Sequence, residues 1–193
     1  FHNIYKFDLI TDELTLVLTD KRFTAAHIFE DNDMRIRVAK EDQEDGSVIY
    51  FRVRSNVSSS ELRTDEDHWQ EYLRVQPEEA MITRFVGFDK TNENAYWIWG
   101  EGSDLGTLIV TPFDDFSDKK TLYEAKRAQM GAPHFHPQER TILWIAELYH
   151  HPEWTVIDDS VREEMLYLEG MRPNSSICDI QLSLSTHLNH NHS

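Results

Sequence analysis

The stretch that decides the fold is residues 82–125, ITRFVGFDKTNENAYWIWGEGSDLGTLIVTPFDDFSDKKTLYEA. It contains four short segments in which apolar residues run together or alternate with polar ones, at 82–88, 95–99, 107–111 and 121–125. Segments of this kind, separated by Gly, Asn and Asp, are typical of β-strands joined by turns. The stretch therefore predicts a sheet of four consecutive antiparallel strands.

The same unit recurs on both sides of this stretch. The preceding unit comprises residues 25–29, 34–39, 48–53 and 69–75, and the following unit comprises residues 133–136, 142–148, 154–157 and 165–168. Two strands are predicted before these units, at 4–9 and 14–18, and one after them, at 177–184. The third strands of successive units begin near Ile4, Val48, Thr107 and Trp154, with spacings of 44, 59 and 47 residues. A period of about 50 residues with four short strands in each unit is typical of β-propeller blades.

The predicted fold class is therefore all-β, a partial β-propeller of four-stranded antiparallel blades. It has about three full blades plus incomplete ends, over residues 1–184. Propellers usually close about four to eight blades into a ring, so we expect the sequence to be a fragment of a longer protein. The His-rich tail, residues 185–193, is predicted to be disordered. Two alternatives remain open: a β-sandwich, and long helices at 122–130 or 160–171.

The composition argues against several classes of partner. The chain has 35 acidic and 19 basic residues and a formal charge of −16, which repels nucleic acid and anionic membrane surfaces. Its single cysteine, Cys178, can form neither an internal disulfide nor a cysteine-based zinc site. This cysteine usage fits a reducing compartment, so a cytoplasmic location is predicted.

Several segments resemble a known family in their order and spacing. They are residues 4–11, IYKFDLIT; residues 31–39, DNDMRIRVA; residues 87–89, GFD; and His136-Pro137 followed by residues 141–146 and 154–158. Together they resemble the N-terminal β-propeller of prolyl-oligopeptidase-family serine peptidases, in the acylaminoacyl-peptidase and dipeptidyl-peptidase-like branch. The resemblance covers roughly residues 4–184. It implies that the propeller caps a separate α/β-hydrolase domain, which carries the catalytic Ser, Asp and His, and that it restricts which peptides enter.

No catalytic residue transfers from the family to this sequence. The nucleophile of such a hydrolase domain lies in Gly-x-Ser-x-Gly, because the turn that exposes the serine tolerates only small neighbours. One glycine pair here has that spacing, Gly102 and Gly106, and its middle residue is Asp104. We therefore expect a non-catalytic propeller portion that gates peptide access, without a cofactor. Its expected partners are the hydrolase domain of the parent chain and a peptide substrate. A stand-alone propeller that acts as a protein-binding scaffold is the alternative.

His134, His136 and Glu139 are the candidates for a metal site. In a strand, residues two apart point to the same face, so both imidazoles can reach one ion and Glu139 can add a carboxylate. A small metal-binding protein that uses His134 and His136 is therefore a lesser alternative. Against it, His136-Pro137 is also an ordinary turn at a strand end. His187, His190 and His192 of the tail can bind divalent metals only nonspecifically.

Two further groups of side chains have both a structural and a functional interpretation. Trp97, Trp99 and Trp144 are predicted to fill the space between blades rather than to form a binding platform. Five arginines alternate along the predicted strands, namely Arg35, Arg37, Arg52, Arg54 and Arg84. By the resemblance, such residues can meet a peptide terminus in the central tunnel. They can equally pair with the abundant carboxylates.

Overall fold

The computed structural model describes residues 2–20, 22–23, 26–55, 57–58, 60–63 and 68–171. The strand predicted at 177–184, the tail at 185–193 and Cys178 lie outside the described residues. The described part is an all-β partial propeller made of antiparallel sheets and a few short helices, as the repeat predicts.

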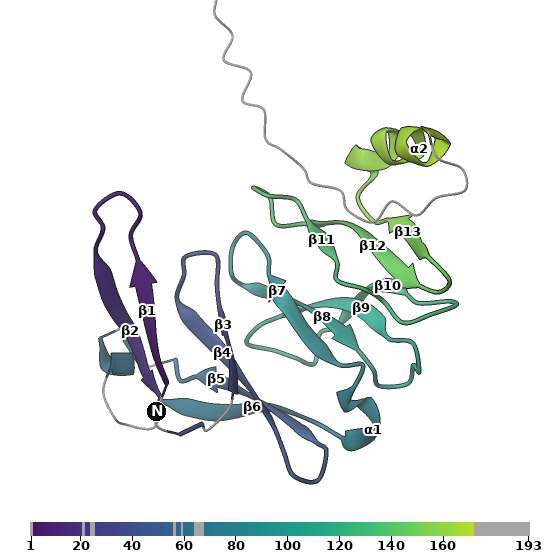
Figure 1. Cartoon of the computed structure of the whole chain (residues 1–193). Coiled ribbons are helices and arrows are strands. Elements are labelled where there is room, and N and C mark those ends of the chain that lie inside the picture. The colour runs from purple at the N-terminus through teal and green to yellow at the C-terminus, as the bar shows by residue number, and fades with distance from the viewer. Residues whose placement is uncertain are drawn as a thin grey trace, which may run out of the picture.

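The sheets follow one another along the chain. The first is a hairpin of β1 (His2–Phe7) and β2 (Leu14–Asp20). The β3–β6 blade contains β3 (Ala26–Glu30), β4 (Ile36–Asp42), β5 (Val48–Val53) and β6 (Trp69–Val75). The β7–β10 blade contains β7 (Arg84–Phe88), β8 (Asn94–Trp99), β9 (Thr107–Pro112) and β10 (Lys120–Glu124). The β11–β13 blade contains β11 (His134–Phe135), β12 (Ile142–Leu148) and β13 (Pro152–Val156). Figure 1 shows these sheets side by side along an arc.

The strand predicted at 165–168 is wrong, because these residues lie in a helix. A 3-10 turn, η2 (Asp159–Val161), leads into α2 (Arg162–Met171). The Asp158 side chain caps this turn by accepting the Ser160 N–H at 2.9 Å. Met165 and Leu168 pack together against β12. Their separation of three residues is the spacing of one helix face and not of one strand face. The helix at 160–171 is therefore confirmed, and the described part of the last blade has three strands.

The other helical elements are short. They are η1 (Glu61–Arg63) and α1 (Pro77–Ala80). The alternative helix at 122–130 is wrong, because β10 runs to Glu124 and a loop follows it. None of the described helices is long and apolar enough to cross a membrane.

Large aromatic side chains fill the space between the two four-stranded blades. Trp97 is fully buried there, and Tyr50 and Phe85 meet it edge to face at centroid distances of 4.9 and 5.1 Å. Phe88 and Phe113 make a similar contact at 5.0 Å. Such pairs add about 0.5–1.5 kcal/mol each to the burial of apolar area. The prediction that Trp97 is a core residue is confirmed.

The strand directions define two rims. Hairpin turns that follow β1, β3, β7 and β11 lie at one end of the sheets, at the top of Figure 1. We call residues 8–13, 31–35, 89–93 and 136–141 the upper rim. The turns after β4, β8 and β12 lie at the opposite end, and they include the glycine-rich loop 100–106. This loop therefore joins the second and third strands of the β7–β10 blade at that rim.

Candidate functional site

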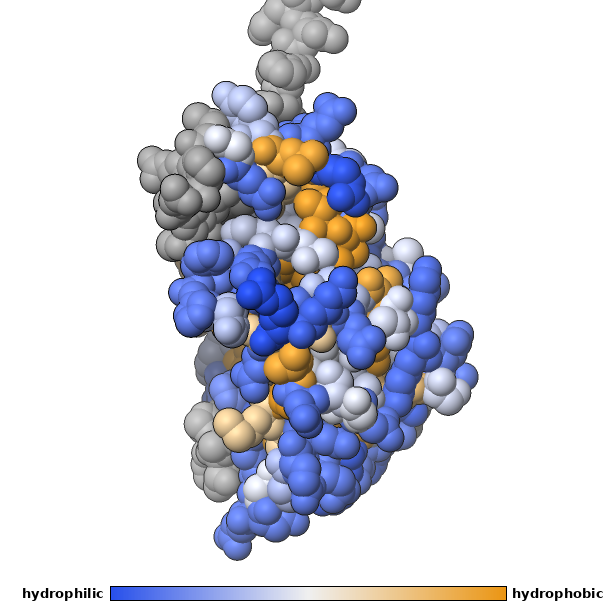
Figure 2. All heavy atoms as spheres, turned by 90° about the vertical axis from the view of Figure 1, so that its right-hand side faces the viewer, coloured by the Kyte–Doolittle hydropathy of each residue, from blue (hydrophilic) through white to orange (hydrophobic). Residues whose placement is uncertain are grey.

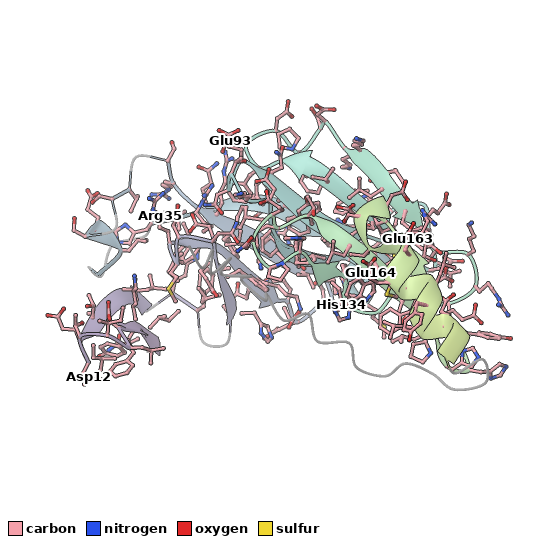
Figure 3. The ribbon with its side chains drawn as sticks, turned by 90° about the horizontal axis from the view of Figure 1, so that it is seen from above. Asp12, Arg35, Glu93, His134, Glu163 and Glu164 are labelled. Atoms are coloured by element: carbon pink, nitrogen blue, oxygen red, sulfur yellow. The ribbon has the colours of Figure 1, made fainter. Side chains whose placement is uncertain are left out.

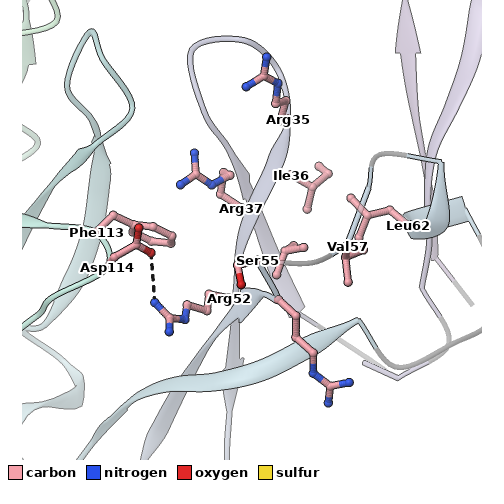
Figure 4. A pocket seen from close by; sticks show the side chains of 11 residues that line it. Arg35, Ile36, Arg37, Arg52, Ser55, Val57, Leu62, Phe113 and Asp114 are labelled. Carbon is pink, nitrogen blue, oxygen red and sulfur yellow. Dashed lines mark hydrogen bonds and ion pairs between the residues drawn. The ribbon is translucent and has the colours of Figure 1, made fainter.

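An arginine-lined pocket opens at the upper rim of the β3–β6 blade (Figure 4). Its volume is about 540 Å³, within the range typical of ligand sites. Its lining comes from the start of β4, the end of β5, η1 with the residues before it, and the residues after β9. These residues are Arg35, Ile36, Arg37, Arg52, Val53, Arg54, Ser55, Val57, Leu62, Phe113 and Asp114.

A β-bulge directs Arg37 into this pocket. In the β3–β4 register, Phe29 pairs with Val38 and Glu30 pairs with Ile36, so Arg37 is an extra residue without a partner. A bulge of this kind breaks the alternation of side chains. Ile36 packs toward the β1–β2 hairpin, whereas Val38 packs toward the β7–β10 blade. Arg37 lies on the same side as Val38 and reaches the β7–β10 blade.

Arg37 is held firmly. Its guanidinium lies 3.1 Å from the carboxylate of Asp31, which is buried, and its carbon Cζ lies 5.0 and 4.8 Å from the ring centroids of Phe88 and Phe113. Removing one partner of an ion pair leaves a buried carboxylate without its counter-charge, which strongly destabilises the folded protein. Arg37 therefore joins two blades as well as lining the pocket.

Arg52 and Arg35 have looser partners. Arg52 lies 3.3 Å from Asp114, whose side chain is 94% exposed (Figure 4). Arg35 lies 3.5 Å from Asp33, and both of these side chains are more than half exposed. Exposed pairs are worth only about 0–1 kcal/mol. Both guanidinium groups can therefore exchange their present carboxylate for that of a ligand.

The guanidinium group of Arg52 also packs over the ring of Tyr72. The Cζ of Arg52 lies 5.5 Å from the centroid of the Tyr72 ring. Burial raises the pKa of Tyr72 well above its usual range, and the opposing effect of Arg52 is smaller. The phenol therefore stays neutral and offers the cation a ring face.

The four turns of the upper rim share one construction. Each begins with a side chain that accepts backbone N–H groups of its own turn. Asp8 accepts from Ile10, Asp31 from Asp33, Asp89 from Glu93, and His136 from Glu139, at 2.8, 2.9, 3.2 and 3.0 Å. Each turn also contains one non-glycine residue with positive φ, namely Asp12, Met34, Asn92 and Arg140. Figure 3, which looks down on this rim, shows Asp12, Arg35 and Glu93 on successive turns.

The three candidate metal ligands each have another contact in the structure. His136 uses Nδ1 to hold its own turn, in the place that aspartate occupies in the other three. The ring of His134 stacks on Trp144 with 4.8 Å between centroids, and Glu139 pairs with Lys90 at 2.9 Å. Among the described residues, no three potential ligands come together in one group. The metal site stays a prediction without a formed cluster.

Neighbouring turns are also tied to each other. Asn32 donates its backbone and side-chain N–H groups to Oδ1 of Asn92, at 3.0 and 2.8 Å, and its side chain also donates to the Asp89 carbonyl. Lys90 and Glu139 connect the next pair of turns. These contacts join three successive blades at the upper rim.

Sequence reasoning singled out Arg35, Arg37, Arg52 and Arg54 without bringing them together, and it missed Asp31 and Asp114. The recurrence of aspartate at the start of the turns, at positions 8, 31 and 89, was the available signal for Asp31. Arg84 lies elsewhere and donates to the carbonyls of Met130 and Gly131 at 2.6 and 2.9 Å. Desolvation lowers the pKa of Arg84, which nonetheless remains charged.

Two curated relatives resemble nearly the whole chain. Dipeptidyl peptidase family member 6 of Caenorhabditis elegans is 44% identical over 183 residues, which are 95% of this chain and 24% of that protein. Dipeptidyl aminopeptidase BIII of Pseudoxanthomonas mexicana is 25% identical over 174 residues, which are 90% of this chain and 23% of that protein. The chain thus spans about a quarter of the length of these relatives. No protein-family model and no solved structure matches it. These homologues are dipeptidyl peptidase family members, which supports the relationship to this class of peptidases.

Proposed function

We propose that this chain, whose homologues are dipeptidyl peptidase family members, is the non-catalytic propeller portion of a serine peptidase of the prolyl oligopeptidase family. It restricts the access of peptides to a hydrolase domain that lies elsewhere in the parent protein. One observation carries the proposal: a succession of blades aligns over 95% of its length with a quarter of a peptidase-family protein.

The tied turns of the upper rim support a gating role. A gate selects by size only if its opening keeps a fixed width. The contacts of Asn32 with Asn92 and of Lys90 with Glu139 oppose separation of neighbouring blades at the rim. In a completed ring, blades held in this way leave an opening that admits short peptides and excludes longer, bulkier chains.

The non-catalytic part of the proposal is tested with the purified chain. We expect no hydrolysis of aminoacyl, dipeptidyl or acyl-peptide reporter substrates, because the sequence contains no Gly-x-Ser-x-Gly. Turnover that a serine-directed inhibitor abolishes would contradict this part.

The gating part is tested in a chimera. The aligned segment of the nematode relative is replaced by this chain, and kcat/KM is measured for dipeptidyl reporters and for peptides of increasing length. We expect the chimera to hydrolyse the short reporters and to lose activity steeply above a threshold length. Equal kcat/KM at all lengths would show that the segment does not restrict access.

A further inference from the structure

We propose that the arginine-lined pocket binds the carboxylate of a peptide. The guanidinium group of Arg52, which now faces Asp114, holds the carboxylate, and the apolar wall of the pocket takes the neighbouring side chain. The inference rests on the proposed function for one point, namely that the ligand is a peptide.

The charge of the pocket favours an anion. Four of the 19 basic residues of the chain line it, with Asp114 as the one carboxylate of the lining, although the whole chain carries −16. Asp31 and Asp33 beside the pocket pair with Arg37 and Arg35, whereas the partner of Arg52 is the exposed Asp114. Since charges more than about 10 Å away are largely screened at physiological salt, a bound ligand responds mainly to these nearby groups, and Arg52 is the one best placed to take a ligand carboxylate.

Asp114 already places one carboxylate beside Arg52. Its carboxylate lies 3.3 Å from Nη1 of Arg52 and is otherwise exposed to solvent. An arginine presents its N–H donors as a planar fork that matches a carboxylate. A ligand carboxylate can displace Asp114 at little energetic cost, because the Asp114 side chain is then free in water.

The opposite wall of the pocket fits an apolar side chain. Ile36 and Leu62 are 6% and 5% exposed, and Val57 packs against the same core cluster. Figure 4 shows Ile36, Val57 and Leu62 on one side of the pocket, with Arg37, Arg52 and Asp114 toward the other. A peptide end with an apolar last residue presents both chemistries at once, since its carboxylate and its side chain leave the same Cα.

Binding is measured by isothermal titration of the full 193-residue chain with three acetylated peptides. One is acetyl-Ala-Ala-Leu with a free C-terminal carboxylate, the second is its C-terminal amide, and the third is acetyl-Ala-Glu-Leu-amide. We expect the free acid to bind at least about tenfold more tightly than the first amide, and added salt to weaken it. If the glutamyl amide binds as tightly as the free acid, the source of the carboxylate is an acidic side chain; if not, it is the chain terminus.

Four variants assign the binding to the pocket. We expect Arg52→Gln to weaken binding of the free acid about three- to tenfold and to leave the amide unchanged, and Arg35→Gln, whose guanidinium group points away from Arg52 in Figure 4, to have a smaller effect. Asp114→Asn removes the competing carboxylate and should tighten binding severalfold. Arg74→Gln is the matched control, because Arg74 is an exposed arginine of the same blade that pairs with Glu71 at 3.1 Å outside the pocket. Thermal unfolding is followed for each variant.

Three results would overturn the proposal: no saturable binding of any peptide, equal affinity for the free acid and its amide, or an Asp114→Asn variant that binds no more tightly than the parent. Asp114 is exposed, so this last variant stays informative even if the arginine variants unfold. None of these results bears on the proposed gating role, since length selection in the chimera is measured independently. Conversely, a chimera without length selection would contradict the gating role and would not change the result of the peptide titration.

Discussion

At the scale of single residues, Glu147 has the most demanding environment in the described chain. Its side chain is nearly buried on β12 and accepts the Tyr123 hydroxyl and the backbone N–H groups of Lys126, Arg127 and Ala128, the last two at 2.7 and 2.9 Å. Burial alone raises the pKa of Glu147, but these hydrogen bonds outweigh it and hold the pKa at about 2. The carboxylate therefore fixes the loop between the last two blades.

This environment predicts acid sensitivity. The folded-state pKa of Glu147 lies below the ordinary value of 4.5, so its stabilisation is present above that value and is lost as the pH falls from about 4.5 to about 2. We expect Glu147→Gln to lower the free energy of unfolding by about 2–3 kcal/mol at neutral pH and to flatten its decline in acid. Urea unfolding at several pH values measures both effects. Glu71→Gln, on an exposed glutamate, is the control; equal losses in the two variants would contradict this role of Glu147.

Gly106 gives a second prediction at this scale. Its φ is +93°, and a Cβ there would lie 2.9 Å from methyl groups of both Ile82 and Ile98. Gly102, in the same loop, has a φ of +75° but no atom within 4 Å of an added Cβ. We expect Gly106→Ala to lower the free energy of unfolding by about 1–3 kcal/mol more than Gly102→Ala. Similar thermal midpoints for the two variants would show that the contacts of Gly106 are not limiting.

Individual site residues were only partly predictable. Alternation along the strands identified the arginines, but the bulge that turns Arg37 depends on pairing with β3, which a single strand does not encode. Asp114 joins the pocket from another blade, 62 residues along the chain from Arg52. The turn-capping role of His136 becomes visible only beside Asp8, Asp31 and Asp89.

At the scale of elements, α2 ends the described part of the chain. Met165 is 3% exposed and packs with Leu143 and Trp144, whereas Leu166 is 62% exposed. Figure 2 looks onto this end of the arc and shows hydrophobic patches among the hydrophilic residues. We expect Met165→Ala to lower the free energy of unfolding by about 2–3 kcal/mol, and Leu166→Ala by less than about 0.5 kcal/mol. Tryptophan fluorescence during urea unfolding measures both, and a reversed order would contradict the docking of α2.

Strands were predicted well at this scale, whereas the last helix was predicted only as an alternative to a strand at 165–168. All thirteen strands in the described residues overlap a predicted segment by most of their length, because turn residues delimit short alternating runs. β11 is reduced to two residues, since its register shifts directly after His134. The run of Met165 to Leu168 is apolar throughout, so it shows neither the period of a helix nor that of a strand. The capping Asp158 and the acidic first turn of Glu163 and Glu164 favour the helix.

At the scale of the whole molecule, the repeat of about 50 residues predicted the order of the blades and their aromatic interfaces. It did not predict how the blades are held at a common rim. Asn32 and Asn92 are 60 residues apart, and each belongs to a turn whose shape depends on its own capping aspartate. Such contacts between loops become apparent only when the blades are in place.

The most direct test of the account is the length selectivity of the chimera when this rim is loosened. The quantity is the ratio of kcat/KM for a dipeptidyl reporter to that for a long peptide, measured for the chimera, for its Asn32→Ala variant and for Asn3→Ala on exposed β1. We predict that Asn32→Ala, which removes the side-chain contacts with Asn92 and Asp89, lowers the ratio severalfold, while Asn3→Ala leaves it unchanged. A ratio that is the same in all three proteins would contradict the claim that this propeller segment gates peptide access.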